Sequence, residues 1–442
     1  MGDALVTDLY ELTMAASFLR RGMATTATFS LFVRSLPADR GFLVAAGLER
    51  CLDYLASFAF TGDDLAALAG AGLAAGDLDA LAGLRFTGDV HAVEEGRVVL
   101  AGEPLLEVTA PLPQAQVVET YLLNQVTYQT ALATKAARCR LAAGGMALFD
   151  FALRRTHGVE AGMAAARAAA IAGFDATSNV AAAHRYRLAA SGTMAHSYVE
   201  AFPTEADAFR AYATDFPDRC TFLVDTYDTL RGVDTAVAVI GELGMAGRPN
   251  LAVRIDSGDL AALARAARRR LDRAGLPQVA IVVSGGLDEH DLARFRAAGD
   301  PVDVVGVGTK VGVSADAPSL ESAYKAVAIG GRPVAKQSAG KATLPGAKQV
   351  WRTDRIDRDV LALRDECGPA GYRPLLRPVM RGGRRTADRP ADADAVALAR
   401  DRLRADLAAL PDAAARTDRP VAPVVTVSAS LSALAAGVAG RS

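Results

Sequence analysis

The sequence predicts an α/β protein whose central part is an irregular (β/α) barrel. From residue 146 onward, short β-rich runs alternate with helical stretches at spacings of roughly 20–30 residues, a pattern typical of βα units and a parallel sheet. The strand-like runs are MALFDFAL, GFDATSN, GTMAHSYV, CTFLVDTY, LAVRIDSG, VAIVVSGG and VDVVGVGT. So many units favour closure into a barrel over an open sheet.

The chain is predicted to have three parts: a mixed α+β domain over 1–145, the barrel over 146–325, and a C-terminal segment over 326–442 that packs on the first two. The barrel is the catalytic domain in this scheme. The last part loses the βα alternation, and its richness in Arg, Asp and Pro predicts a peripheral lobe.

The first part mixes helical and strand-like patterns. TDLYELTMAASFLRRGM has helical spacing, with Thr7 or Asp8 as a suitable N-cap. TATFSLFVRSLP alternates as a strand does and stops at Pro37. FTGDVHAVEEGRVVLAGEPLLEVTAPL resembles short strands of a small β-barrel or sandwich, and VVETYLLNQVTYQTALATKAARC predicts a long amphipathic helix.

Composition narrows the classes of function. With 51% hydrophobic residues among 442, the chain can bury a large core, and its formal net charge of -1 gives no electrostatic argument for a nucleic-acid or membrane partner. The N-terminus lacks the pattern of a secretory signal, and no apolar run is long enough to span a membrane. The four cysteines lie far apart and form no CxxC pair. We therefore expect a cytoplasmic protein.

Barrel enzymes collect their functional groups at the carboxyl ends of the strands. Polar and glycine residues follow nearly every strand-like run here: Arg154, Arg155, Asn179, His196, Asp225, Asp228, Asp256, Asp259, Gly285, Gly286, Gly308 and Thr309. Helix capping explains some of the carboxylates, and we favour it for Asp259. Capping does not require two arginines, a histidine and two glycine clusters, so a binding site is expected at this edge.

Two glycine turns, VVSGG and VVGVGT, come late in the alternation. Backbone N–H groups in such turns suit a phosphate, and barrels often bind phosphate at their last strands. Either turn alone is explained more simply as a tight turn, but the pair favours phosphate. The P-loop pattern is absent from the sequence.

The carboxylates and basic residues suggest complementary roles. Asp225 and Asp256 suit ribose hydroxyls, Mg²⁺ held together with substrate phosphates, or a developing cation. Arg154 and Arg155 are adjacent, so only one need enter the site. For His196 the residues leave open a general base, a covalent phosphate carrier and a structural role. The histidines are scattered singly, which does not indicate a zinc site.

These motifs together resemble the nicotinate phosphoribosyltransferase family over most of the chain. The resemblance lies in TDLYELTM, FSLFVRSLPADRGFLVAAGLE, LLNQVTYQTALATKAAR, FALRRTHG, GFDATSNV, GTMAHS, VDTYDT, RIDSGDL, GVGT and TLPGAKQVWR, in that order. It implies a type II phosphoribosyltransferase, a dimer that joins nicotinic acid to phosphoribosyl pyrophosphate in NAD salvage. ATP as co-substrate, a phosphohistidine and Mg²⁺ are implied as well.

The resemblance also assigns residues. It makes His196 the phosphorylated histidine, with Asp256 at the ribose and Arg154 at the pyrophosphate. It gives the substrate-binding set as Tyr10, Thr193, Arg254, Asn179, Asp225, Lys135 and Arg138, with Tyr10 stacking on the pyridine in the neighbouring subunit's site. It places phosphate at Gly285, Gly286, Gly308 and Thr309, and Mg²⁺ at Asp225 and Asp256. Ala152 stands where the motif commonly has Gly, and Gly285-Gly286 replace a more usual Asn-containing turn.

Three alternatives remain at this point. A nicotinamide phosphoribosyltransferase would share the fold and mechanism, although an arginine facing the ring substituent favours the acid. A non-catalytic nucleotide-binding paralogue would be expected to lack some of the site residues, and none is missing. A generic sugar-phosphate barrel enzyme would explain the glycines but not Tyr10 or GTMAHS.

Overall fold

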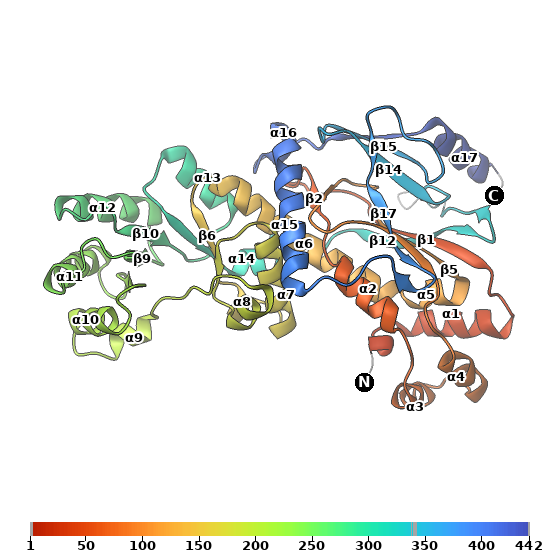
Figure 1. The fold of residues 1–442 in the computed structure, drawn as a ribbon, viewed down its shortest axis with the longest axis horizontal. Coiled ribbons are helices and arrows are strands. Elements are labelled where there is room, and N and C mark those ends of the chain that lie inside the picture. The colour runs from red at the N-terminus through yellow and green to blue at the C-terminus, as the bar shows by residue number, and fades with distance from the viewer. Residues whose placement is uncertain (1–2, 337, 339–342, 441–442) are drawn as a thin grey trace. The chain divides into compact units, whose positions relative to one another are not determined.

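The computed structural model describes residues 3–336, 338 and 343–440 (Figure 1). The chain divides into two compact units: unit 1 comprises residues 1–134 and 317–442, and unit 2 comprises residues 135–316. The C-terminal segment therefore belongs to the same unit as the N-terminal domain. The long predicted helix is present as α6 (Glu119–Ala143), whose residues fall in both units.

Unit 1 is built on a seven-stranded antiparallel sheet. Its order is β13 (Arg332–Pro333), β12 (Ser322–Ile329), β1 (Thr26–Val33), β5 (Pro104–Pro111), β3 (Asp89–Val93), β17 (Leu376–Arg381) and β18 (Arg384–Arg385). Two of the predicted short strands of the N-terminal part, β3 and β5, thus share one sheet with strands from the C-terminal segment. Leu31, Val90 and Val108 on these strands are fully buried and contribute to the core of this unit.

Smaller sheets and helices complete unit 1. A four-stranded sheet has the order β16 (Arg373–Pro374), β14 (Lys348–Arg352), β15 (Arg358–Leu363) and β19 (Val424–Val427), and β2 (Leu43–Val44) pairs with β4 (Val98–Val99). The helices are α1 (Leu9–Arg20), α2 (Leu48–Ser57), α3 (Gly62–Gly70), α4 (Ala75–Ala82), α5 (Leu112–Val117), α15 (Asp392–Ala409), α16 (Asp412–Ala415) and α17 (Ala429–Ala439), with a 3₁₀ turn at Asp3–Leu5.

Unit 2 contains the predicted parallel sheet, which curls into a half-barrel. Its order is β7 (Ala176–Thr177), β6 (Ala147–Asp150), β11 (Val304–Val307), β10 (Ala280–Val283), β9 (Ala252–Ile255) and β8 (Thr221–Leu223), and every pair is parallel. No pairing joins β7 to β8 within residues 135–316, all of which the structure describes. The α/β fold class with an irregular barrel is confirmed.

Helices alternate with these strands, as the sequence pattern predicted. They are α7 (Val159–Ile171), α8 (Val180–Tyr186), α9 (His196–Glu200), α10 (Glu205–Asp215), α11 (Thr229–Glu242), α12 (Leu260–Arg273), α13 (Glu289–Ala298) and α14 (Thr309–Gly312), with a 3₁₀ turn at Leu153–Arg155. Val253, Ile281 and Val305 are fully buried at the centre of the sheet. Parallel strands need such apolar runs because helices on the crossover connections cover them.

One predicted strand is wrong. GTMAHSYV was expected to be β-rich with His196 at a strand end, but residues 191–195 form an irregular segment and His196 begins α9. Only an isolated bridge between Thr177 and Ala190 continues the sheet there. Gly192 weakens strand formation, and the extended backbone of Ala195 places it at the N-cap of a helix that buries Val199.

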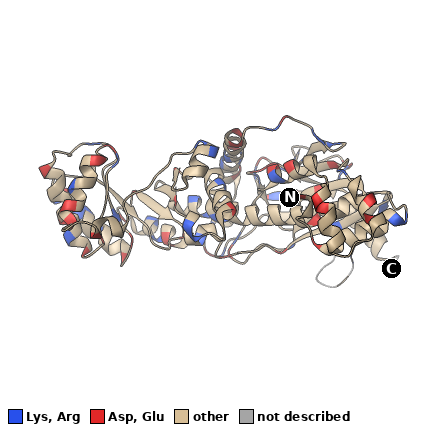
Figure 2. Cartoon of the chain, turned by 90° about the horizontal axis from the view of Figure 1, so that it is seen from below, with Lys and Arg blue, Asp and Glu red and all other residues tan. Residues whose placement is uncertain are grey.

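The surface charge is mixed. In Figure 2 the positions of Lys and Arg are interspersed with those of Asp and Glu along the helices, which is consistent with the formal net charge of -1. Among the residues that the structure describes, no helix combines the length and the apolar character needed to cross a membrane.

Candidate active site

A cavity of about 180 Å³ lies at the carboxyl edge of the parallel sheet in unit 2. Phe151 and Ser178 follow the last residues of β6 and β7, Leu223 ends β8, and Asp256 follows β9. The lining residues are Phe151, Arg154, Ser178, Gly192, Thr193, Met194, Ala195, His196, Leu223, Arg254 and Asp256. The edge at which barrels place their chemistry therefore carries a pocket with five of the predicted site residues.

Arg254 makes three hydrogen bonds within this site. Its Nε donates to Ser284 Oγ at 2.8 Å, Nη1 donates to Thr193 Oγ1 at 2.9 Å, and Nη2 donates to Asp256 Oδ1 at 2.7 Å. Its guanidinium also lies 5.5 Å from the centre of the Phe151 ring. A guanidinium has five N–H groups, so one remains on each terminal nitrogen after these bonds. Two such N–H groups suit a carboxylate.

Asp256 is held by charged and polar neighbours. Its carboxylate accepts from Arg254 and, in a very short contact, from the Ser284 hydroxyl. Burial works to raise the pKa of Asp256, but the Ser284 hydrogen bond, the Arg254 guanidinium and the nearby His196 together hold that pKa below its ordinary value. Asp256 is therefore an anion at neutral pH, suited to stabilise positive charge in the pocket.

Asp225 supports Asp256 from the neighbouring strand. Its Oδ2 accepts from the backbone N–H of Asp256 at 3.0 Å and from the Ser257 hydroxyl at 2.6 Å. Its Oδ1 is buried and has no hydrogen-bond partner among the described residues. Asp225 thus holds the loop after β9 and retains one acceptor atom.

His196 lies in the pocket lining at the first residue of α9. Its Nδ1 is 3.1 Å from the hydroxyl oxygen of Thr226, a residue of the loop that follows β8. This contact fixes the orientation of the imidazole ring. The ring is half-buried, so it remains accessible from the cavity.

Both predicted glycine turns lie against pocket-lining segments. Gly285 has φ +109°, and a Cβ there would approach the carbonyl oxygen of Asp256 to 2.2 Å. Gly286 has φ +72°. A Cβ on Gly308 would lie 3.0 Å from the carbonyl oxygen of Phe151. The missing side chains allow the loops after β10 and β11 to pack against the segments that carry Asp256 and Phe151.

Thr309, Arg154 and Arg155 lie shortly after the ends of β11 and β6. Thr309 begins α14, directly after Gly308. Arg154 lines the cavity and is exposed, so its guanidinium is available to an anion. Its neighbour Arg155 does not line the cavity. The two capping candidates Asp228 and Asp259 both cap helices, α11 and α12, through their side chains.

Other predicted substrate-binding residues are engaged elsewhere. Lys135 Nζ lies 2.6 Å from Glu289 Oε2 and 3.1 Å from Asp316 Oδ1, and Arg138 Nε donates to Glu289 Oε1 at 3.0 Å. These cations are buried and do not line the cavity. Asn179 is also buried and caps α8 through its side chain.

Tyr10 belongs to unit 1. It lies on α1 and is 48% exposed. Burial of its ring and the nearby Glu119 and Glu11 carboxylates raise the pKa of its hydroxyl, which therefore stays protonated at neutral pH.

Sequence reasoning did not find five residues of the site: Phe151, Ser178, Met194, Thr226 and Ser284. Each lies within a motif that had been recognised for another residue. Ser284, for example, directly precedes the two glycines of VVSGG, and Thr226 follows Asp225 in VDTYDT. Phe151, Ser178 and Ser284 each directly follow the last residue of a strand, and that position was the available signal. Thr226 lies in the loop after β8, and Met194 lies in the irregular segment before α9, so neither residue had this signal.

Metal ligands are sparse. Among the described residues, no group of three or more His, Cys, Asp or Glu side chains could hold a metal ion by itself. Asp256 lines the pocket, and Asp225, which does not line it, holds the backbone N–H of Asp256 and keeps one oxygen without a partner among the described residues. One or two carboxylates are enough for Mg²⁺ when substrate phosphates and water provide the remaining ligands.

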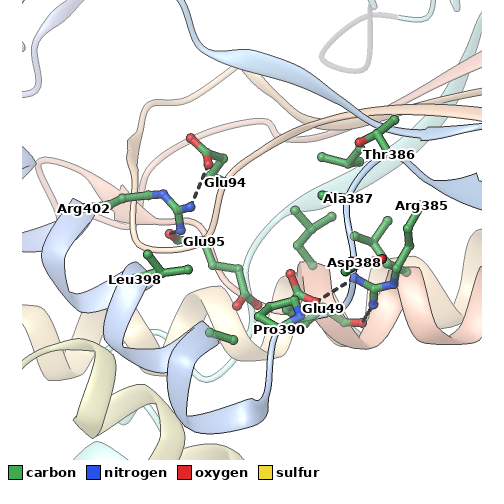
Figure 3. A pocket seen from close by; sticks show the side chains of 14 residues that line it. Glu49, Glu94, Glu95, Arg385, Thr386, Ala387, Asp388, Pro390, Leu398 and Arg402 are labelled. Atoms are coloured by element: carbon green, nitrogen blue, oxygen red, sulfur yellow. Dashed lines mark hydrogen bonds and ion pairs between the residues drawn. The ribbon is translucent and has the colours of Figure 1, made fainter.

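A second cavity, of about 170 Å³, lies in unit 1 between α2, α15 and the segment that follows β18 (Figure 3). Two ion pairs lie in its lining: Arg385 Nη1 is 2.8 Å from Glu49 Oε2, and Arg402 Nη2 is 2.7 Å from Glu94 Oε1 (Figure 3). None of the predicted site residues lines this cavity. The pocket in unit 2 is therefore the candidate active site.

The fold and the pocket define an α/β half-barrel enzyme that has an arginine, a carboxylate and a histidine at the carboxyl edge of its parallel sheet. Two family models match the chain: the nicotinate phosphoribosyltransferase N-terminal domain over residues 5–127 and the nicotinate phosphoribosyltransferase family over residues 146–344. The chain belongs to the nicotinate phosphoribosyltransferase family.

Individual relatives agree with this membership. A nicotinate phosphoribosyltransferase of Mycobacterium tuberculosis is 46% identical over 414 residues, which cover 92% of this chain and 88% of the relative. One of Bacillus subtilis is 44% identical over 378 residues, which cover 82% and 76%. The crystal structure of human nicotinic acid phosphoribosyltransferase has a TM-score of 0.83 and 31% identity, and the match covers 98% of this chain and 99% of the human chain.

Proposed function

We propose that the protein is a nicotinate phosphoribosyltransferase, which joins nicotinic acid to phosphoribosyl pyrophosphate and releases nicotinate mononucleotide and pyrophosphate. The reaction belongs to the salvage route to NAD and is coupled to ATP hydrolysis. Beside the family membership, the observation that carries the proposal is Arg254: held by Thr193, Ser284 and Asp256, it keeps one N–H on each terminal nitrogen in the pocket. That pair of donors suits the carboxylate of nicotinic acid.

In the reaction, the pyridine nitrogen attacks C1 of the ribose, the C1–oxygen bond breaks, and pyrophosphate leaves with the bonding electrons. Positive charge develops on the ribose and negative charge on the leaving group. Asp256 is an anion and stabilises the first, while the exposed Arg154 guanidinium stabilises the second. The pyridine nitrogen is a weak nucleophile, so the alignment provided by Arg254 and Thr193 matters for the rate.

The two glycine turns bind the ribose 5-phosphate in this proposal. Gly285 and Gly286 follow β10, and Gly308 and Thr309 follow β11, the neighbouring strand. Backbone N–H groups of such turns approach a phosphate without obstruction by a Cβ. The adjacency of the strands brings the two turns to the same part of the sheet edge.

Mg²⁺ is part of the proposal. Asp225 and Asp256 would hold it together with the substrate phosphates, and the buried Oδ1 of Asp225 without a partner supports this assignment. When bound, the ion would neutralise charge on the pyrophosphate.

His196 is the proposed phosphate acceptor from ATP. A ring nitrogen attacks the γ-phosphorus, a P–N bond forms, and ADP leaves; later hydrolysis releases orthophosphate and restores the imidazole. The half-buried ring in the pocket lining and its contact with Thr226 support this role. A phosphate at this position adds negative charge beside Arg254 and Asp256, which would change substrate affinity.

We also propose a homodimer in the cytoplasm, with Tyr10 reaching the partner's site. Val6, Leu9, Tyr10 and Met14 are large apolar side chains exposed in and just before α1, and a partner subunit would bury them. The four free cysteines suit a reducing compartment.

The proposal is tested by competition and by labelling. The purified protein is given phosphoribosyl pyrophosphate, ATP and Mg²⁺ with equal nicotinic acid and nicotinamide, and the two mononucleotides are separated; nicotinate mononucleotide should dominate. Incubation with γ-labelled ATP should give an acid-labile label on the wild-type protein that is absent from His196→Ala. Nicotinamide mononucleotide as the main product would contradict the substrate, and unchanged labelling of His196→Ala would contradict the phosphohistidine.

A further inference from the structure

Ser284 is placed between the two charged groups that dominate the pocket. It follows β10, is only 2% exposed, and does not line the cavity itself. Its hydroxyl oxygen accepts from Arg254 Nε at 2.8 Å, and its hydroxyl hydrogen is donated to Asp256 Oδ1. The Ser284 hydroxyl therefore accepts a hydrogen bond from Arg254 and donates one to Asp256, and both of these residues line the pocket.

We propose that Ser284 is a positioning residue that fixes Arg254 for recognition of the substrate carboxylate and holds the Asp256 carboxylate in its orientation toward the pocket. The inference rests on the proposed function of the site. Ser284 does not touch substrate, because the cavity is lined by Arg254 and Asp256 and not by the serine.

The geometry explains why a hydroxyl is needed. The Arg254 guanidinium is held on three sides, by Ser284 at Nε, Thr193 at Nη1 and Asp256 at Nη2. Without the bond at Nε, the rigid guanidinium of Arg254 can turn about its side-chain bonds, and its two remaining N–H groups are no longer fixed relative to the pocket. Binding of a planar carboxylate depends on that fixed fork.

The same hydroxyl orients Asp256. Ser284 and Arg254 Nη2 both donate to Oδ1 of Asp256, and Asp256 lines the pocket. Loss of the Ser284 hydroxyl would leave Arg254 as the only one of these two donors.

The test uses the full-length protein with Ser284→Ala, and Ser284→Cys as a near-isosteric variant if the alanine protein does not fold. The expected result is a rise in KM for nicotinic acid of about tenfold and a smaller rise in KM for phosphoribosyl pyrophosphate. In an Arg254→Lys background, Ser284→Ala should raise KM for nicotinic acid much less, because the Nε donor is already gone.

Ser30→Ala is the matched control. Ser30 is fully buried in unit 1, and its hydroxyl has no hydrogen-bond partner among the described residues, so its loss should leave both KM values unchanged. Wild-type KM values in Ser284→Ala and Ser284→Cys would overturn the inference, as would an equal rise in KM in the Arg254→Lys background. Absence of mononucleotide formation by the wild-type protein would instead contradict the proposed function.

Discussion

The carboxylate of Asp225 accepts a hydrogen bond from the backbone N–H of Asp256 at 3.0 Å, which ties the end of β8 to the end of β9. Asp225 also accepts from the Ser257 hydroxyl at 2.6 Å. One side chain therefore holds two consecutive residues of the loop in which the anionic group of the pocket is located. The position of Asp256 depends on its neighbour strand as well as on Arg254 and Ser284.

Replacement of Asp225 should reduce catalysis more than stability. In Asp225→Asn the side chain keeps one acceptor but loses its charge and Oδ1, so the loop after β9 is held less firmly and the proposed Mg²⁺ ligand is lost. We expect kcat/KM to fall at least about a hundredfold, as is typical when a charge-stabilising group is removed. Steady-state kinetics over a range of Mg²⁺ concentrations measure this change.

Asp259→Asn is the control for that experiment. Asp259 caps α12 by accepting from the Ala262 N–H at 3.0 Å, and asparagine caps helices about as well as aspartate. This variant should keep nearly wild-type kinetics. Equal losses of kcat/KM in Asp225→Asn and Asp259→Asn would show that any change in these loops lowers activity, and that Asp225 has no special role.

Gly285 and Gly286 should differ sharply in their tolerance of alanine. At Gly285 a Cβ would meet the Asp256 carbonyl oxygen at 2.2 Å, and φ is +109°, so the loop must move. At Gly286 φ is +72° and no atom lies within 4 Å of an added Cβ. We expect Gly285→Ala to lower the free energy of unfolding by about 3 kcal/mol or more, and Gly286→Ala by about 1–2 kcal/mol.

Chemical denaturation of both variants measures the difference, and kcat/KM of the folded protein reports on the site. Gly285→Ala should also lose activity, because the displaced loop pushes on the segment that carries Asp256. Equal unfolding free energies for the two variants would argue against the close approach of the loops after β9 and β10.

The sequence predicted an irregular (β/α) barrel, and the parallel sheet with alternating helices was predicted well because its signals are local. Runs such as LAVRIDSG and VAIVVSGG combine a buried apolar strand with a polar or glycine-rich end, and the parallel pairing brings those ends to one edge. His196, Arg254, Asp256 and Arg154 were accordingly predicted for one site, and they line one cavity.

What the sequence could not predict depends on distant partners. Strand β17 pairs with β3 although nearly 300 residues separate Val93 from its partner Leu376, and no local pattern specifies that pairing. The family resemblance assigned Lys135 to substrate binding, but its partner Glu289 is the first residue of α13, which lies much later in the chain. The proposed role of the Ser284 hydroxyl depends on its hydrogen bond with Arg254, which lies 30 residues earlier in the chain.

The buried group of Lys135, Arg138 and Glu289 should contribute to stability and not to substrate affinity. Glu289 is fully buried between the two cations, so Glu289→Gln leaves positive charge without full compensation. We expect a loss of about 3–5 kcal/mol in the free energy of unfolding, with KM for phosphoribosyl pyrophosphate unchanged in the folded protein. Denaturation and kinetics at low temperature measure both quantities. A raised KM would favour the sequence-based prediction that Lys135 and Arg138 bind substrate.

A buried carboxylate in unit 1 should make the protein less stable as the pH rises. Glu103 is fully buried, its Oε2 accepts from the Leu100 N–H at 2.8 Å and lies 3.5 Å from Arg352 Nη2, and its Oε1 has no partner among the described residues. Burial, with the Asp359 carboxylate beside it, raises the pKa of Glu103 well above its ordinary value, although Arg352 acts to lower it. Asp406, 4.0 Å from Arg352, adds a further negative charge to this cluster.

The direction of the pH effect on stability follows from the difference between the pKa of Glu103 in the folded protein and in the unfolded chain. The folded protein keeps the proton on Glu103 at pH values where the unfolded chain has already lost it, so the stabilisation is complete below the ordinary pKa and disappears as the pH rises through the raised one. Within that window this single group lowers the free energy of unfolding by about 1.4 kcal/mol per pH unit. Glu103→Gln keeps the shape without the titration, so its stability should decline less steeply than that of the wild type. Denaturation curves of both proteins from mildly acid to mildly alkaline pH measure the difference, and parallel declines would mean that Glu103 is ionised in the fold.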